Sequence, residues 1–185
     1  MNRFATPAQR RRLFVRSALI LCPVLLALGM LSGYASGSDE NNPWFAGLVK
    51  PALYPPPIAF PVVWTVLYLL MGVALALVMA TPRTHQRALA IAAFVVQFAL
   101  NLAWSPTFFW AHSIGSALVV IVLLDLALIA TIVLFGRVHK PAAWLLAPYL
   151  LWSLFATGLN WQLLQDNPAG GRVPGVEAGD ALALS

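Results

Sequence analysis

Hydrophobic side chains form long runs along the chain, and shorter polar stretches separate them. Each run approaches or exceeds the ~20 apolar residues that a helix needs to cross a bilayer. None has the strict alternation of apolar and polar positions that is typical of a membrane β-barrel strand. The pattern therefore predicts five transmembrane helices, over residues 13–33, 58–80, 88–109, 114–135 and 142–165.

The connections between these runs predict how the helices are arranged. Residues 81–87, 110–113 and 136–141 are short links, so consecutive helices should be antiparallel neighbours. The predicted fold is an all-α integral membrane protein, a bundle of five transmembrane helices with a long Pro-rich loop, residues 34–57, between the first two.

The predicted membrane domain spans residues 13–165, between two segments of different character. Residues 1–12 form a basic N-terminal segment, and residues 166–185 form a tail rich in Gly, Ala and Pro that we expect to be flexible. Within the long loop, the stretch KPALYPPP at 50–57 cannot be helical throughout, because proline favours a stiff, extended path. Such a loop could lie across one end of the bundle as a lid.

Composition supports the membrane assignment. Of 185 residues, 61% are hydrophobic and only 9% are charged, against about 25% charged in a typical soluble domain. The net charge is +5, but five arginines fall within the first sixteen residues, directly before an apolar run. That position is typical of a topology signal and argues against nucleic-acid binding.

The charges of the connections alternate along the chain. The N-terminus and links 81–87 and 136–141 are basic, whereas loop 34–57 and the tail carry more acidic than basic residues. The positive-inside rule therefore predicts the N-terminus inside and the C-terminus outside. An alternative treats residues 1–35 as a cleaved signal peptide, but the apolar run exceeds the usual length of about 7–15 residues.

Few residues point to metal or covalent chemistry. Cys22 is the only cysteine, so no intrachain disulfide can form, and the three histidines fall in three different links. We expect no metal site and no required cofactor. Gly29 and Gly33 form a G-x-x-x-G pattern, which predicts close helix packing within the chain or, alternatively, a homodimer face.

Polar and aromatic residues inside the apolar runs are the candidate site. Asp125 lies near the centre of the fourth predicted helix and should face the bundle interior, as a ligand or proton site or as a hydrogen-bond partner of a neighbouring helix. Three groups each share one helical face. They are Trp64 with Tyr68, Asn101 with Trp104 and Phe108, and Trp152 with Ala156 and Leu159. If these faces converge, they form an apolar pocket with a few polar groups, which is typical of a small-ligand site.

The tryptophans divide into two groups. The chain has seven, and Trp44, Trp110 and Trp144 lie near predicted helix ends, which is typical of an interfacial aromatic belt. Trp64, Trp104 and Trp152 lie further inside, where an indole offers a face for stacking and one N–H.

Three long segments resemble the TspO/MBR family, the tryptophan-rich sensory proteins of bacteria and the mitochondrial translocator protein (peripheral benzodiazepine receptor). They are KPALYPPPIAFPVVWTVLYLLMG at 50–72, NLAWSPTFFWAHSIGSAL at 101–118 and PAAWLLAPYLLWSLFATGLNWQLLQDN at 141–167. With the five predicted helices and the long first loop, the resemblance covers roughly residues 40–167.

The resemblance implies a five-helix bundle, often dimeric, that binds tetrapyrroles such as protoporphyrin IX in a pocket on the first-loop side. By motif position the pocket residues would be Trp64, Asn101, Trp104, Trp152, Ala156 and Leu159. The resemblance gives Asn101 the role of offering its amide to a ligand carbonyl or carboxylate. Trp64 and Trp152 would flank the ligand, and they match tryptophans linked to light-dependent porphyrin breakdown in some members.

This chain departs from the family pattern at the loop and at the last helix. Leu53 and Ile58 stand where the family often has tryptophan, which predicts less stacking surface in the lid. The cholesterol motif of mitochondrial relatives has Trp161 in place of its tyrosine and Gln165 in place of its basic residue, so cholesterol binding loses its local support.

Three functions follow as hypotheses. The favoured one is a membrane receptor or transporter that binds porphyrins and similar planar apolar ligands, with a role in tetrapyrrole or stress regulation. The first alternative is a light- and oxygen-dependent porphyrin-degrading enzyme that uses Trp64 and Trp152. The second is a structural or partner-binding membrane protein whose aromatic residues only pack.

Overall fold

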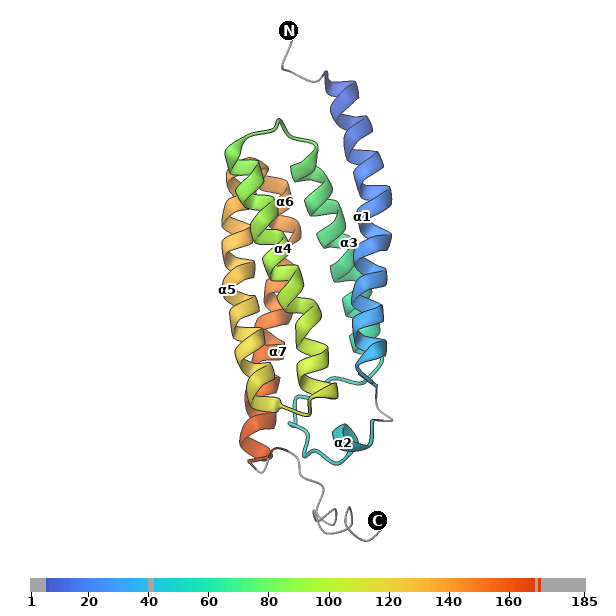
Figure 1. The fold of residues 1–185 in the computed structure, drawn as a ribbon, viewed down its shortest axis with the longest axis vertical. Helices are drawn as coiled ribbons and strands as arrows, with labels where there is room; N and C mark the ends of the chain where they lie inside the picture. The colour runs from blue at the N-terminus through green and yellow to red at the C-terminus, as the bar shows by residue number, and fades with distance from the viewer. Residues whose placement is uncertain (1–5, 40–41, 169, 171–185) are drawn as a thin grey trace, which may run out of the picture.

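The computed structural model describes residues 6–39, 42–168 and 170, and long helices dominate this part of the chain. The elements are α1 (Pro7–Ala35), α2 (Pro43–Ala46), α3 (Ala59–Met79), α4 (His85–Ser105), a π-helical turn η1 (Pro106–Trp110), α5 (Ile114–Val138), α6 (Lys140–Leu145) and α7 (Ala147–Asp166). The long helices run side by side along the long axis of the molecule, and α2 lies across one end of the bundle (Figure 1). The described residues include no strand.

Five helical segments are long and apolar enough to cross a membrane, and they coincide with the five predicted runs. The first is longer than its run because α1 begins at Pro7. Thr6 accepts a hydrogen bond from the backbone N–H of Gln9, and the Gln9 side chain accepts one from the N–H of Thr6. This capping box, followed by proline at the first helical position, starts the helix inside the basic segment.

The last run is interrupted at Leu146, between α6 and α7. Pro148 has no N–H to donate to the carbonyl of Trp144, four residues earlier, which favours a break at this point. Residues 1–5 of the basic segment, and residues 169 and 171–185 of the predicted flexible tail, lie outside the described residues.

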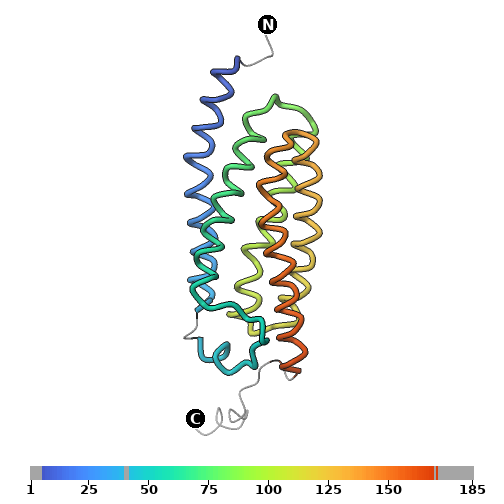
Figure 2. Tube along the Cα trace, turned by 180° about the vertical axis from the view of Figure 1, so that it is seen from behind, coloured from blue at the N-terminus to red at the C-terminus, as the bar shows by residue number. Residues whose placement is uncertain are grey.

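The connection between α1 and α3 contains a helix that the sequence pattern did not predict. Asn42 caps α2 by accepting a hydrogen bond from the N–H of Phe45 at 3.1 Å, and Pro43 occupies the first helical position. Residues 49–58 form no helix. Figure 2 shows this connection crossing beneath the bundle from α1 to α3.

Small residues let α1 approach α3 closely. A Cβ atom added at Gly72 would lie 2.8 Å from the Cα atom of Cys22, and Gly29 lies directly against the ring of Tyr68. Gly29 therefore serves packing within the chain, one of the two expected roles of the G-x-x-x-G pattern. The homodimer face stays a prediction.

Large apolar side chains cover the outside of the bundle. Leu19, Leu126 and Leu151 are each at least 60% exposed, whereas Asp125 is only 6% exposed. This is the reverse of a water-soluble helical protein, in which charged residues cover the surface. Such an outer surface suits contact with lipid.

Pro106 changes the end of α4. Because proline has no N–H, the carbonyl of Leu102 loses its usual helical partner. The Ser32 hydroxyl of α1 donates to that carbonyl at 2.7 Å instead. The backbone then widens into η1, where the N–H of Ala111 bonds to the carbonyl of Pro106 at 2.9 Å. The proline thus produces a wider helical turn and an anchor between α1 and α4.

Candidate ligand-binding site

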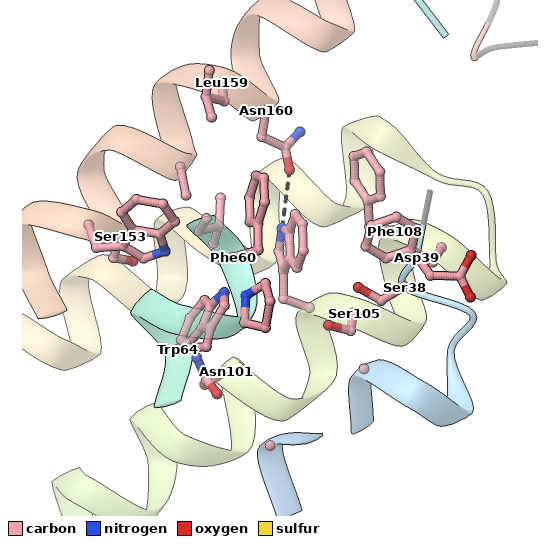
Figure 3. A pocket seen from close by; sticks show the side chains of 18 of the residues that line it. Ser38, Asp39, Phe60, Trp64, Asn101, Ser105, Phe108, Ser153, Leu159 and Asn160 are labelled. Atoms are coloured by element: carbon pink, nitrogen blue, oxygen red, sulfur yellow. Dashed lines mark hydrogen bonds between the residues drawn. The ribbon is translucent and has the colours of Figure 1, made fainter. Parts of the chain in front are cut away.

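A cavity of about 550 Å³ lies between α3, α4 and α7, at the end of the bundle that carries α2, and residues of α1 and α5 complete its wall. Its walls are mostly apolar and aromatic, with a small number of amides and hydroxyls among them. Figure 3 shows Phe60 and Trp64 of α3, Asn101 of α4 and Leu159 of α7 around one space. This combination of shape and lining is typical of a small-ligand site.

The cavity brings together the three helical faces that the sequence groups separately. The predicted residues that line it are Trp64, Tyr68, Asn101, Trp104, Phe108, Trp152, Ala156 and Leu159. Asp125 does not line the cavity formed by the described residues; it lies one hydrogen bond behind Ser153, which does. The Asn101 amide thus faces the same space as Trp64 and Trp152.

Two tyrosines hold the Asn101 amide. The hydroxyl of Tyr68 donates to Oδ1 of Asn101 at 2.9 Å, and Nδ2 of Asn101 donates to the hydroxyl of Tyr149 at 2.9 Å. Tyr149 is fully buried and Asn101 is 6% exposed. An amide has two N–H groups and two oxygen lone pairs, so one of each remains for a ligand after these bonds. The network fixes the direction in which Asn101 presents them.

Trp64 and Trp152 reach the cavity from different helices, and each contacts another ring. Trp64 stacks on Tyr68 with ring centroids 5.3 Å apart and an interplanar angle of 28°. Trp152 meets Phe60 edge to face at 5.9 Å. Trp64 also meets the ring of Tyr149 with centroids 6.0 Å apart and an interplanar angle of 67°, so two tyrosines hold its indole in the cavity wall.

Trp104 is held by a residue that the helical-face grouping did not include. Its Nε1 donates to Oδ1 of Asn160 at 3.1 Å, and Nδ2 of Asn160 donates to the carbonyl of Ile114 at 3.0 Å. The indole also stacks on Phe108 with ring centroids 5.0 Å apart. Trp104 therefore contributes an apolar surface to the cavity, because its N–H is already used. Asn160 follows Trp152 and Ala156 at four-residue spacing, which is the signal that could have revealed it.

Asp125 forms a buried cluster with two hydroxyls of α7. Ser153 Oγ donates to one carboxylate oxygen at 2.5 Å, and Thr157 Oγ1 donates to the other at 2.7 Å. The sequence left two interpretations of Asp125 open, a ligand or proton site and a hydrogen-bond partner of a neighbouring helix. The structure contains the hydrogen bonds of the second interpretation. Ser153 is 2% exposed and forms part of the cavity wall, so the cluster also reaches the cavity.

The segment around α2 closes the end of the cavity. Phe45 packs against Phe108 and Phe109 of η1 and against Tyr54, and Lys50 donates to its carbonyl at 3.1 Å. Trp44 is buried and stacks on His112 with centroids 4.7 Å apart. Trp110 and Trp144 are more than 75% exposed, in contrast to Trp44.

Asn167 fastens this segment to the end of α7. Its Oδ1 accepts a hydrogen bond from the N–H of Val49, and its Nδ2 donates to the carbonyl of Val49, both at 3.0 Å. The Asn167 amide therefore pairs with both the N–H and the C=O of one residue, as a neighbouring strand does in a β-sheet. The pair holds the loop closed over the cavity without covalent attachment.

Replacing Asn167 with alanine should loosen the loop. Two hydrogen bonds worth about 1 kcal/mol each are lost, so backbone amides of residues 44–49 should exchange with deuterium about thirtyfold faster. The exposed neighbour Gln165, changed to alanine, serves as the control and should leave exchange unchanged. Equal exchange in Asn167→Ala and the unmodified protein would show that the loop is held by its aromatic contacts alone.

Comparison with known proteins places this geometry in a family. Residues 19–165 match the TspO/MBR family. The tryptophan-rich protein TspO of Chlorobaculum tepidum is 41% identical over 154 residues, which cover 81% of this chain and 96% of that protein. The protein CrtK of Rhodobacter capsulatus is 37% identical, with 82% and 95% covered. The human translocator protein is 39% identical, with 79% and 89% covered.

The family match runs through all five long helices and includes every described residue that lines the cavity. Their extent agrees with five helices that are long and apolar enough to cross a bilayer. The chain is a multi-pass integral membrane protein and belongs to the TspO/MBR family.

Proposed function

We propose that the protein binds planar, apolar ligands of the porphyrin class in the cavity between α3, α4 and α7. The observation that carries the proposal is the meeting of Trp64, Asn101 and Trp152, from three helices, around one space. Two indoles provide stacking surface and the amide provides one oriented polar contact. Ligand sites typically combine apolar walls with a few placed polar groups in volumes of about 300–1,000 Å³.

The names of the relatives support a receptor or transporter role. The human relative is called a translocator protein and a relative from Cereibacter sphaeroides a tryptophan-rich sensory protein. We accordingly propose a receptor or transporter that acts in tetrapyrrole or stress regulation. Binding requires only shape, stacking and one polar contact, which the cavity residues provide, whereas porphyrin breakdown would also require reactivity. Binding is therefore the function proposed.

The aromatic lining of the loop comes from positions other than those expected from the family pattern. Leu53 and Ile58 are at least 70% exposed and lie outside the cavity wall formed by the described residues. Phe45 and Tyr54 line the cavity instead. The loss of tryptophan at 53 and 58 therefore leaves the lid with aromatic surface in contact with the cavity.

The charges favour an orientation in which the cavity opens toward the outside. The start of α1, the α3–α4 connection with Arg83, the first turn of α4 with Arg87 and the last turn of α5 with Arg137 lie at one end of the bundle. The α2 loop and the end of α7 lie at the other. With the basic end inside, the cavity and its lid are on the outer side, with the end of α7.

A titration with protoporphyrin IX tests the proposal. Addition of the porphyrin to the detergent-solubilised protein should quench tryptophan fluorescence saturably, and Trp152→Ala should weaken binding about tenfold, since an aromatic contact contributes about 0.5–1.5 kcal/mol beyond its buried area. Trp144→Phe is the control, because Trp144 is 77% exposed and lies outside the cavity. Quenching that does not saturate, or equal affinity for all three proteins, would reject the cavity as the site.

A further inference from the structure

Asp125, Ser153 and Thr157 form a buried polar cluster directly behind one wall of the cavity. Ser153 Oγ and Thr157 Oγ1 each lie within hydrogen-bond distance of a different oxygen of the Asp125 carboxylate. Thr157 Oγ1 also lies 3.0 Å from the carbonyl of Ser153, which gives its hydrogen a second acceptor. Each hydroxyl has only one hydrogen, so these contacts limit the directions that the bonds can take.

If Asp125 is ionised, both hydroxyls donate to it. If the carboxyl carries a proton, that proton fits on the oxygen beside Thr157, because the Thr157 hydroxyl can then turn to the Ser153 carbonyl. A proton on the other oxygen would displace the Ser153 hydrogen from the only acceptor that it has among the described residues. Ser153 therefore donates to Asp125 in both favourable protonation states.

This direction has a consequence for the cavity wall. With its hydrogen directed at Asp125, Ser153 can offer the cavity only oxygen lone pairs. It is therefore an acceptor, in contrast to the Asn101 amide, which keeps both a donor and an acceptor after its bonds to Tyr68 and Tyr149. A ligand carbonyl placed at Ser153 would meet no hydrogen-bond donor. The free-energy cost of removing that carbonyl from water would therefore not be offset by a new hydrogen bond.

We propose that Ser153, oriented by Asp125, is a specificity-determining residue that selects ligands with an outward-facing N–H group at this wall of the cavity. Ser153 makes the contact, and Asp125 is a positioning residue that acts through it. The ligand class is a planar, apolar molecule with an N–H on its edge, such as a pyrrole, indole or secondary amide. This inference rests on the proposed binding function and adds a preference among the planar ligands that the cavity binds. Protoporphyrin IX, whose pyrrole N–H groups point to the centre of its ring, should bind without this contact.

A matched pair of planar probes, carbazole and N-methylcarbazole, tests the proposal. The two differ only in whether the ring nitrogen carries hydrogen. We expect the unmodified protein to bind carbazole about fivefold more tightly, the equivalent of one hydrogen bond of about 1 kcal/mol. Ser153→Ala should abolish the preference, and the lipid-facing control Leu154→Ala, at 48% exposure, should retain it.

Substitutions at Asp125 separate orientation of Ser153 from simple structural support. Asp125→Asn should retain the preference, because its amide can accept from Ser153 while donating to Thr157. Asp125→Leu frees the Ser153 hydrogen and should remove the preference even if N-methylcarbazole affinity is unchanged. Equal affinity of the unmodified protein for both probes, or a preference that survives Ser153→Ala, would overturn the inference.

Protoporphyrin IX in the same assay distinguishes the two proposals. If it binds and displaces both probes, but the probes bind equally, only the selection by Ser153 is rejected. If neither the porphyrin nor either probe binds saturably, both the binding function and the selection are rejected.

Discussion

Replacing Asn101 with leucine should lower the free energy of unfolding by about 3 kcal/mol. Leucine is close to asparagine in size, so the change mainly removes the two hydrogen bonds to Tyr68 and Tyr149. Both tyrosine hydroxyls then stay buried but no longer have the Asn101 amide as a hydrogen-bond partner. Each buried polar group that loses its partner lowers the free energy of unfolding by about 1–3 kcal/mol. Denaturant unfolding in detergent micelles, followed by helical circular dichroism, measures the effect.

A double-mutant cycle gives the control for this prediction. Tyr149→Phe removes the hydroxyl that would otherwise lose its partner when Asn101 is replaced. In this background Asn101→Leu should therefore lower the free energy of unfolding by about 1 kcal/mol less than in the unmodified protein. Additive effects of the two substitutions would mean that the Asn101–Tyr149 bond contributes nothing to stability. A cost of Asn101→Leu below about 0.5 kcal/mol would contradict the network altogether.

The second large effect is expected at Gly72, where α1 and α3 are closest. A valine there would place Cβ 2.8 Å from the Cα atom and 2.9 Å from the backbone nitrogen of Cys22. Backbone atoms cannot rotate away, so α1 must move, at a cost of about 3 kcal/mol, the upper end of the range for overpacked sites. Because Gly29 and Gly33 of α1 line the cavity, the displacement should also weaken ligand binding.

Gly158 provides the matched control for Gly72. It lies within α7, and a Cβ added there meets no other heavy atom within 4 Å among the described residues. Gly158→Ala should therefore leave stability unchanged or raise it by up to about 1 kcal/mol, through the better helix propensity of alanine. Thermal unfolding in detergent micelles, followed by helical circular dichroism, measures both variants. If Gly72→Val unfolds at the same temperature as the unmodified protein, α1 does not pack on α3 as described.

The membrane-spanning helices could be predicted from sequence because hydropathy and length report directly on burial in lipid. The boundaries were less predictable. The start of α1 at Pro7 depends on the capping box of Thr6 and Gln9, and the break at Leu146 depends on Pro148. Helix α2 escaped prediction because four residues are too short for an apolar period; only Asn42 followed by Pro43 signals it.

The candidate site was predictable where its residues share one helix. Asn101 and Trp104, or Trp152 and Ala156, fall on a common face by spacing alone. Contacts between helices could not be predicted, since helical spacing does not determine how each helix is rotated about its axis. The hydrogen bonds that Tyr149, Asn160 and Ser153 of α7 make to residues of α4 and α5 are therefore seen only in the structure.

Protection of a cysteine inside the cavity tests most directly whether a porphyrin occupies it. Cys22 is the only cysteine, so Cys22→Ala gives a background for single substitutions. Ala156→Cys places a thiol in the cavity wall, and Ala111→Cys places one at an exposed position outside it. The rate of thiol labelling is measured with and without saturating protoporphyrin IX. The proposed site predicts slower labelling at 156 and no change at 111, and porphyrin-independent labelling at 156 would contradict it.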